Sequence, residues 1–584
     1  MNKIPCTMVD LRKAPTWTLT VLLLALVGCD SALQSTLAPA SAAGAASPVS
    51  DAYVFGQADL AAAEAITAER MRRVIAELAS DRYEGRAPGS AGDQLTQRFL
   101  SAELQGLGLQ PGGDDGGWLQ RVPLVGLKSE SPAQWSFHGS ATSADLARGT
   151  DFIAVSGVQA ASASLVDAEL VFVGYGIEAP EYQWDDFKGS DLRGKVLVML
   201  NNDPDWDEAL FAGTTRLYYG RWSYKYESAA RQGAAGAIII HTPASAGYPW
   251  QVVQTSWGGE QFQLQAGDEP RLQVSAWVTE AAAARLLTLA GHDLAALQAQ
   301  ARDRNFRPVP LGLTTSLQLT NTLSRQESAN VIGVLPGSDP ALAHEVVVFT
   351  AHHDHLGLVP AETPGEDRVY NGALDNASGV AQVLAMASAF TALPEPPRRS
   401  IMFNFVAAEE QGLLGSRYYA EHPTYAPGRI AANINVDGVA IWGRSRDLTL
   451  IGFGKSSLDA VVTEVARLQG RVVTDDQFPD RGSFYRSDQF NFAKIGVPAV
   501  YADTGTDILG QPPGWGADRI NHYNDVDYHQ PSDELTADWN FEGAVEDGQL
   551  LFLVGLRVAN ETALPRWKAG DEFEAVRLRA LQAP

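Results

Sequence analysis

Residues 346–355 read VVVFTAHHDH, and the interpretation of the whole chain starts from them. The stretch begins as an apolar, mostly β-branched run and ends with three of the chain's ten histidines within four residues. Imidazole and carboxylate groups that are buried together need partners, so packing alone does not explain this cluster. We therefore interpret the end of this predicted strand as half of a metal site.

Length and composition indicate a folded protein with more than one domain. The chain has 584 residues, which is too long for one simple core. Its hydrophobic fraction of 45% and charged fraction of 19% are typical of globular proteins. The formal net charge of −25 makes nucleic acid or an anionic membrane surface an unsuitable partner for the folded body. We expect no nucleic-acid binding, whereas cations can still be held locally.

The beginning of the chain has the features of a targeting segment. A basic region containing Lys3, Arg12 and Lys13 precedes a mostly apolar stretch over residues 17–27, which is too short to span a bilayer. The stretch ends in Leu26-Val-Gly-Cys29, which resembles a bacterial lipobox.

This resemblance implies a lipid anchor. We expect residues 1–28 to be a lipoprotein-type signal peptide and residues 29–55 a flexible tether rich in Ala, Ser and Pro. A lipid on Cys29 would then hold the exported protein in the bacterial cell envelope, on the periplasmic face or the cell surface. The alternative is an ordinary signal peptide that is cut nearby, which would give a secreted protein.

Cysteine is not expected to bind a metal. The chain has only Cys6 and Cys29, and cleavage would leave one of them. A lipidated Cys29 can be neither a disulfide partner nor a metal ligand. Any metal must therefore be held by histidine, aspartate and glutamate.

Hydrophobic periodicity predicts two folded regions. Apolar residues at helical spacing predict helices over residues 60–78 and 93–107, and short strands begin near residue 168. After residue 324 strands and helices alternate, which predicts an α/β fold with a mixed, mostly parallel sheet flanked by helices. The predicted parts are residues 56–130 and 323–565 for the main domain, residues 131–322 for an inserted smaller α/β domain, and residues 566–584 for a C-terminal tail.

Side chains suited to metal binding follow several of these predicted strands, and ligands of open α/β sheets bind at the carboxyl ends of strands. The candidates are His352, Asp354, Asp375, Glu409, Glu410, Asp437 and His529. An isolated acid at a strand end is usually a helix cap or a solvated turn, so the interpretation depends on the whole set. Nitrogen and oxygen ligands without sulfur suit zinc, and also manganese or cobalt.

Five segments resemble the dinuclear zinc aminopeptidases of peptidase family M28, a family that also contains glutamate carboxypeptidase. They are residues 351–357 (AHHDHLG), 371–379 (NGALDNASG), 407–416 (AAEEQGLLGS), 435–437 (NVD) and 528–533 (YHQPSD). Both their order and their spacing match. The inserted domain resembles the protease-associated domain that some members carry.

The resemblance implies a role for each matching residue. The implied terminal ligands of two zinc ions are His352, Glu410, Asp437 and His529, with Asp375 bridging both ions. Glu409 would be the general base, Asp354 would orient His352, and Tyr528 would stabilise the tetrahedral intermediate. A cis peptide bond is expected between Asp375 and Asn376.

Neighbouring residues are expected to have other roles. Adjacent strand positions point to opposite faces, so neither His353 nor His355 is expected to bind metal. Arg486 either lines a substrate pocket or forms a structural ion pair. Gln489 stands where relatives often have histidine, which argues against proton transfer at that position.

These features predict a zinc-dependent exopeptidase, with an aminopeptidase acting on peptides as the first hypothesis. The alternatives are a carboxypeptidase, a glutaminyl cyclase-like enzyme, or a lipid-anchored binding protein without catalysis. In the inserted domain, Tyr248, Trp250 and Trp257 either contact substrate or belong to the packing of that domain.

Overall fold

The computed structural model describes residues 53–140, 142–208, 210–358 and 367–582. The predicted signal peptide, Cys29 and nearly all of the predicted tether lie outside the described residues. Within the described ranges, no helix is both long enough and apolar enough to cross a membrane.

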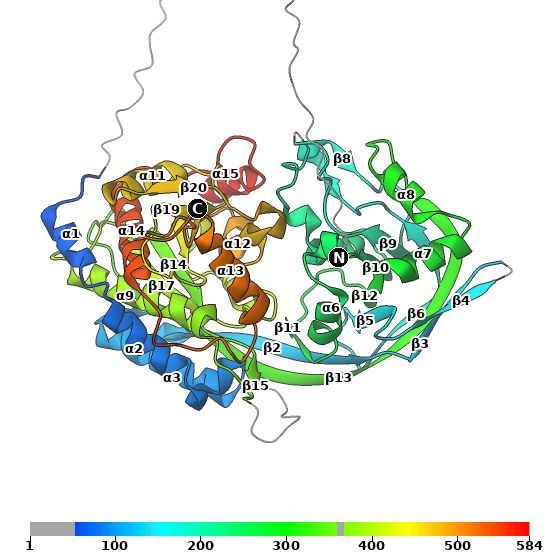
Figure 1. The fold of residues 1–584 in the computed structure, drawn as a ribbon, viewed down its shortest axis with the longest axis horizontal. Coiled ribbons are helices and arrows are strands. Elements are labelled where there is room, and N and C mark those ends of the chain that lie inside the picture. Colours follow the sequence, from blue (N-terminus) through cyan, green and yellow to red (C-terminus); the bar gives the residue numbers. More distant parts are fainter. Residues whose placement is uncertain (1–52, 141, 209, 359–366, 583–584) are drawn as a thin grey trace, which may run out of the picture. The chain divides into compact units, whose positions relative to one another are not determined.

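The main domain is built on a mixed sheet (Figure 1). The pairs β17–β14, β14–β18, β18–β21 and β19–β20 are parallel and the other neighbouring pairs are antiparallel, which confirms the predicted mixed, mostly parallel sheet. In order across the sheet, the strands are β1 (Gln110–Pro111), the end of β13 (Val309–Leu335), β17 (Ser400–Val406), β14 (Val346–His352), β18 (Ile430–Asn435), β21 (Ala499–Asp503), β19 (Asp447–Ile451) and β20 (Val472–Thr474).

The central strand β14 is buried on both faces, which explains its continuous apolar sequence. Val347 and Phe349 belong to one hydrophobic cluster, whereas Val346 and Val348 belong to another on the opposite face. The first cluster is formed with helices α2 (Ala68–Leu78), α9 (Gly379–Ala392), α11 (Leu458–Leu468) and α14 (Glu542–Asn560). The second is formed with α10 (Leu414–Glu421) and α12 (Gln489–Lys494).

The predicted helix over residues 60–78 is two helices, α1 (Gln57–Ala63) and α2. The side chain of Thr67 accepts a hydrogen bond from the backbone N–H of Arg70 at 3.3 Å. Threonine is a favourable N-cap, so it begins a new helix where the apolar periodicity alone continues the first one. The helix predicted over residues 93–107 is α3 (Ala91–Gly106).

The inserted segment has hydrophobic clusters of its own, while its strands join the main sheet through β13. Strands β6, β9, β10 and β12 are parallel, and β5 pairs with β12 in the antiparallel sense. The bounds are β5 (Phe152–Ser156), β6 (Ser162–Phe172), β9 (Val196–Leu200), β10 (Gly236–His241), β12 (Val274–Thr279), α4 (Trp222–Arg231), α7 (Glu280–Leu289) and α8 (Leu294–Ala301).

A long antiparallel ribbon joins the two regions. Strand β2 (Leu119–Glu130) pairs along β13 from Val331 to Thr320, and Figure 1 shows the two strands running side by side. The earlier part of β13, from Val309 to Thr320, lies in the inserted segment and pairs there with β6.

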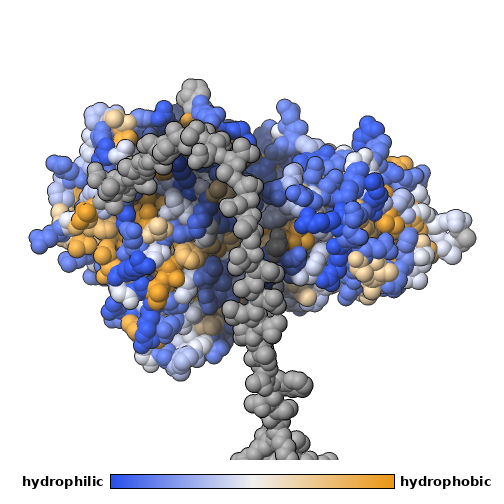
Figure 2. Space-filling view, turned by 90° about the horizontal axis from the view of Figure 1, so that it is seen from above, coloured by the Kyte–Doolittle hydropathy of each residue, from blue (hydrophilic) through white to orange (hydrophobic). Residues whose placement is uncertain are grey.

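The aromatic residues of the inserted segment pack within it. Tyr248, Trp250 and Trp257 are partly buried against the hydrophobic cluster that contains Trp277. Trp250 also donates its indole N–H to the carbonyl of Gly149 at 2.7 Å. These contacts agree with packing, the second of the two roles considered for them. Figure 2 shows a face on which hydrophilic residues predominate and apolar residues occur in scattered groups.

Candidate metal centre

Three neighbouring parallel strands bring acidic and histidine side chains to one edge of the main sheet. β14 ends at His352, which is paired with Val406 at the end of β17, and Glu409 and Glu410 follow in the next turn. Asp437 follows the end of β18, the strand on the other side of β14. Because parallel strands end at the same edge, residues that are far apart in the sequence meet there.

Asp375 lies at the centre of this group. Its Oδ1 atom is 3.1 Å from His352 Nε2, and its Oδ2 atom is 3.1 Å from His529 Nε2. His352 Nε2 is also 3.1 Å from Asp437 Oδ1, and His529 Nε2 is 3.0 Å from Glu410 Oε2. The five predicted ligands therefore form two sets of three that share one carboxylate.

The chemistry of these residues fits metal ions. A ring nitrogen carries at most one hydrogen, yet each of the two Nε2 atoms faces two carboxylate oxygens. Among the described residues, the ion pairs of Asp375, Glu409, Glu410 and Asp437 are all with histidines, and none is with lysine or arginine. Buried carboxylates without a permanent cation are suited to divalent ions, and this nitrogen and oxygen donor set suits zinc.

The electrostatics of the group are strongly coupled. Burial by itself would lower the pKa of His352, but the carboxylates of Asp437 and Glu409 raise it well above its usual value. Burial raises the pKa of Glu409 well above its usual value, against the opposing effect of His352. The protonation of His352 and of Glu409 therefore depends on the charged groups around them.

Asp354 lies beside His352 and has two further partners. Its Oδ1 atom is 3.7 Å from His352 Nδ1, an ion-pair distance that is longer than a hydrogen bond. Its two oxygens also accept the backbone N–H groups of Glu409 at 3.0 Å and Glu410 at 3.3 Å. The geometry therefore connects Asp354 with the turn that carries both glutamates.

The two histidines that follow His352, which are His353 and His355, have different partners from each other. His353 Nε2 is 3.0 Å from the carbonyl oxygen of Ala329, away from the cluster. His355 Nδ1 is 2.6 Å from Glu410 Oε1, and together with Asp375 and Glu410 it forms a group whose ligand atoms lie within 4.8 Å of one another. β14 ends at His352, so His355 lies outside the strand and strand alternation does not set the direction of its side chain.

The remaining predicted residues also lie near the centre. The Tyr528 ring stacks on the His529 ring with centroids 3.8 Å apart, and burial raises the pKa of Tyr528 to about 12. The peptide bond between Asp375 and Asn376 is cis, as predicted. Gln489 is buried and accepts a hydrogen bond from Asn435 Nδ2 at 2.9 Å.

Sequence reasoning missed several supporting residues. Asp533 accepts the backbone N–H groups of Leu374 and Asp375 at 2.9 and 3.1 Å. Ser487 donates its hydroxyl to Asp437 Oδ2 at 2.7 Å. The buried guanidinium of Arg86 donates to backbone carbonyls of His353, Leu78, Asn371 and Gly372. An arginine in a loop gives no sequence signal for such contacts.

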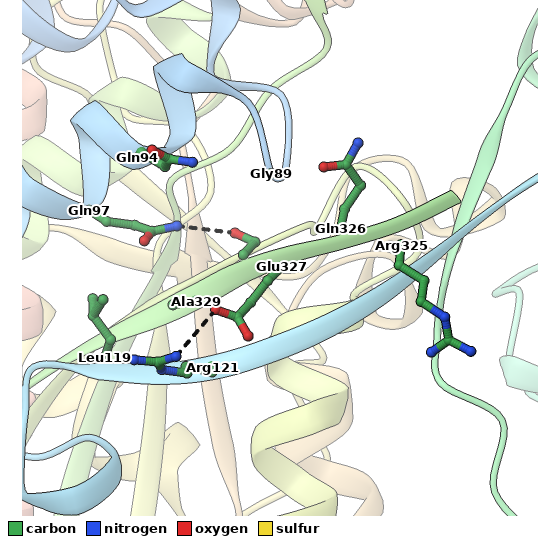
Figure 3. Close-up of a pocket in the computed structure, with 10 residues that line it drawn as sticks. Gly89, Gln94, Gln97, Leu119, Arg121, Arg325, Gln326, Glu327 and Ala329 are labelled. Carbon is green, nitrogen blue, oxygen red and sulfur yellow. Dashed lines mark hydrogen bonds and ion pairs between the residues drawn. The ribbon is translucent and has the colours of Figure 1, made fainter. Parts of the chain in front are cut away.

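Two cavities lie elsewhere in the molecule. One, of about 350 Å³, lies on the β2–β13 ribbon, where Arg121 and Glu327 form an ion pair at 3.7 Å (Figure 3). The other, of about 450 Å³, lies in the inserted segment and is lined by residues that include Asn201, Asp203 and Arg302. Neither is lined by the proposed ligands.

Residues 330–553 match the sequence profile of peptidase family M28. The part of the chain that resembles this family is less than half of its length. The matched residues include the five proposed ligands and Glu409.

Known proteins resemble part of this chain, over part of their own length. Leupeptin-inactivating enzyme 1 of Streptomyces exfoliatus is 29% identical over 38% of this chain and 47% of its own. Aminopeptidase YwaD of Bacillus subtilis is 28% identical over 37% of this chain and 44% of its own. The match therefore spans less than half of the length of these relatives. Among solved structures, an aminopeptidase from Aneurinibacillus sp. strain AM-1 aligns with 87% of this chain and 97% of its own, at 18% identity and a TM-score of 0.47.

Proposed function

We propose that this protein is a zinc-dependent aminopeptidase that removes residues from the N-terminus of peptides, with two zinc ions and Glu409 as general base. The observation that carries the proposal is Asp375, whose two oxygens lie 3.1 Å from two different histidines. The M28 match and the aminopeptidase among the relatives support the reaction class.

Each of the chain's own residues has a defined task. His352, Asp375 and Asp437 would hold one zinc ion, and His529, Asp375 and Glu410 the other. When bound, zinc lowers the pKa of a water molecule and polarises a carbonyl group. Glu409 accepts the proton of the attacking water and transfers it to the leaving amine. Tyr528 donates a hydrogen bond to the oxygen that becomes negative in the transition state.

Substitution of Glu409 tests the proposal. Glu409→Ala should abolish hydrolysis of peptides with a free N-terminus, while bound zinc, measured by elemental analysis, stays at two ions per chain. Glu421→Ala, at an exposed site on α10, is the matched control and should retain activity. Turnover by Glu409→Ala would contradict the role of the base, and one zinc ion per chain in the unsubstituted protein would favour a cyclase-like enzyme.

The proposal also includes the setting of the enzyme. Export and attachment through a lipid on Cys29 are inferred from Leu26-Val-Gly-Cys29. The inserted segment is proposed to act as a protease-associated domain that limits access of large substrates. Palmitate labelling of the unsubstituted chain, with no labelling of Cys29→Ser, is the expected result for the anchor.

A further inference from the structure

Three arginines from two parts of the chain gather beside the M28 centre without a carboxylate partner. Arg216 and Arg221 belong to the inserted segment, and Arg486 belongs to the main domain. Among the ion pairs of the described residues, none includes any of these three guanidinium groups. For Arg486, this favours a pocket-lining role over a structural ion pair.

Direct contacts join the two segments that carry the arginines. The backbone N–H of Arg216 donates to the carbonyl of Pro479 at 3.0 Å. The ring of Tyr218 lies 4.7 Å, between centroids, from that of Phe490. Gly482 packs so closely that a β-carbon on it would lie 3.3 Å from Arg216 Cβ. Residues 216–221 are therefore held against residues 479–490.

The arginines are close enough to repel one another. Burial, together with repulsion by Arg486, lowers the pKa of Arg221 to about 9. Burial also lowers the pKa of Arg216, where Asp203 and Asp480 act against the lowering. The Nε atoms of Arg216 and Arg221 are buried and, among the described residues, have no hydrogen-bond partner. An unpaired buried cation is unfavourable, so an anion bound here would relieve an existing cost.

Arg486 connects this cluster with the metal centre. The next residue, Ser487, donates its hydroxyl to Asp437 Oδ2 at 2.7 Å. Arg486 is exposed, so its guanidinium is accessible to a ligand.

We propose that Arg221 and Arg486 bind a carboxylate of the peptide substrate, so that the preferred substrates are short peptides with a carboxylate near the scissile bond. The planar guanidinium fork matches a carboxylate and can bind it through two hydrogen bonds. The carboxylate is either the C-terminal group of a dipeptide or an acidic side chain. This inference rests on the proposed peptidase function, because it concerns the substrate of the same centre.

Binding measurements separate the inference from the proposed function. Calorimetry with the zinc-loaded Glu409→Ala protein would compare four probes: Leu-Leu, Leu-Leu-amide, Leu-Glu-amide and Leu-Gln-amide. We expect Leu-Leu to bind more tightly than its amide if the C-terminal carboxylate is recognised, and Leu-Glu-amide more tightly than Leu-Gln-amide if the side chain is recognised.

Arginine substitutions then test the assignment. Arg486→Gln and Arg221→Gln should each weaken binding of the preferred carboxylate peptide about tenfold or more, with little change for the matching neutral peptide. Arg486→Lys should retain part of the preference because it keeps the charge. Arg193→Gln, at an exposed arginine of the inserted segment that pairs with Asp191, is the control and should leave binding unchanged.

The two hypotheses fail in different ways. Equal binding of carboxylate and neutral peptides, or equal weakening of both by the arginine substitutions, would overturn the carboxylate site. Absence of turnover by the unsubstituted enzyme, together with a carboxylate preference that the arginine substitutions remove, would instead contradict the peptidase proposal and leave the carboxylate site supported.

Discussion

Asp375 places its Oδ2 atom 3.1 Å from Nε2 of His529, in the loop that follows α13 (Trp515–Val526). The other oxygen of Asp375 faces His352 on the central strand. One carboxylate thus contacts both a strand end and a loop. The second ligand set is complete only when that loop holds His529 beside Asp375.

Removal of the His529 side chain should therefore remove one metal ion and keep the other. We expect His529→Ala to bind one zinc ion per chain, because His352, Asp375 and Asp437 remain. Asp375→Ala should weaken binding of both ions. Elemental analysis after dialysis measures the stoichiometry, with His522→Ala, at an exposed histidine of α13, as the control. Two ions in His529→Ala would mean that His355 holds the second set, which His355→Ala would then reveal.

Asp354 should act through the turn that carries Glu409 and Glu410. Asp354→Asn replaces one carboxylate oxygen by an NH₂ group, which cannot accept a hydrogen bond. One of the two backbone N–H groups, of Glu409 or Glu410, therefore loses its acceptor. We expect kcat/KM or zinc affinity to fall about 10- to 100-fold, as is usual for partners of metal ligands. Steady-state kinetics and zinc titration measure both quantities. Asp191→Asn, at an exposed site, should match the unsubstituted enzyme, and full activity in Asp354→Asn would show that the turn keeps its geometry without this carboxylate.

Arg86 should stabilise the loops around the centre. Its buried guanidinium donates to four backbone carbonyls, so Arg86→Gln leaves several buried acceptors without donors. We expect a loss of about 3 kcal/mol in the free energy of unfolding. Arg82→Gln in the same loop removes an exposed ion pair with Glu77 and a cation–π contact with Tyr83, and should cost less than about 1 kcal/mol. Denaturant unfolding compares the two, and equal losses would contradict the role given to Arg86.

Much of the main domain was predictable because local patterns coincide with its elements. Strands β14, β17 and β18 are buried along their whole length and mostly apolar, and a ligand-type residue ends β14 and comes two or three residues after β18 and β17. The continuity of β13 was not predictable. Its burial alternates in the inserted sheet and becomes continuous in the main sheet, without a turn residue at the expected boundary near residue 322.

The identity of the proposed ligands could be read from the chain, because their residue types follow strand ends in a recognisable order. Their pairing could not, because it depends on contacts between segments that are far apart in the sequence. Long-range packing places His529 on Asp375, places Asp354 against the backbone of Glu409, and brings Arg216 against Pro479. Local periodicity describes each element separately, whereas these distances depend on how the elements pack together.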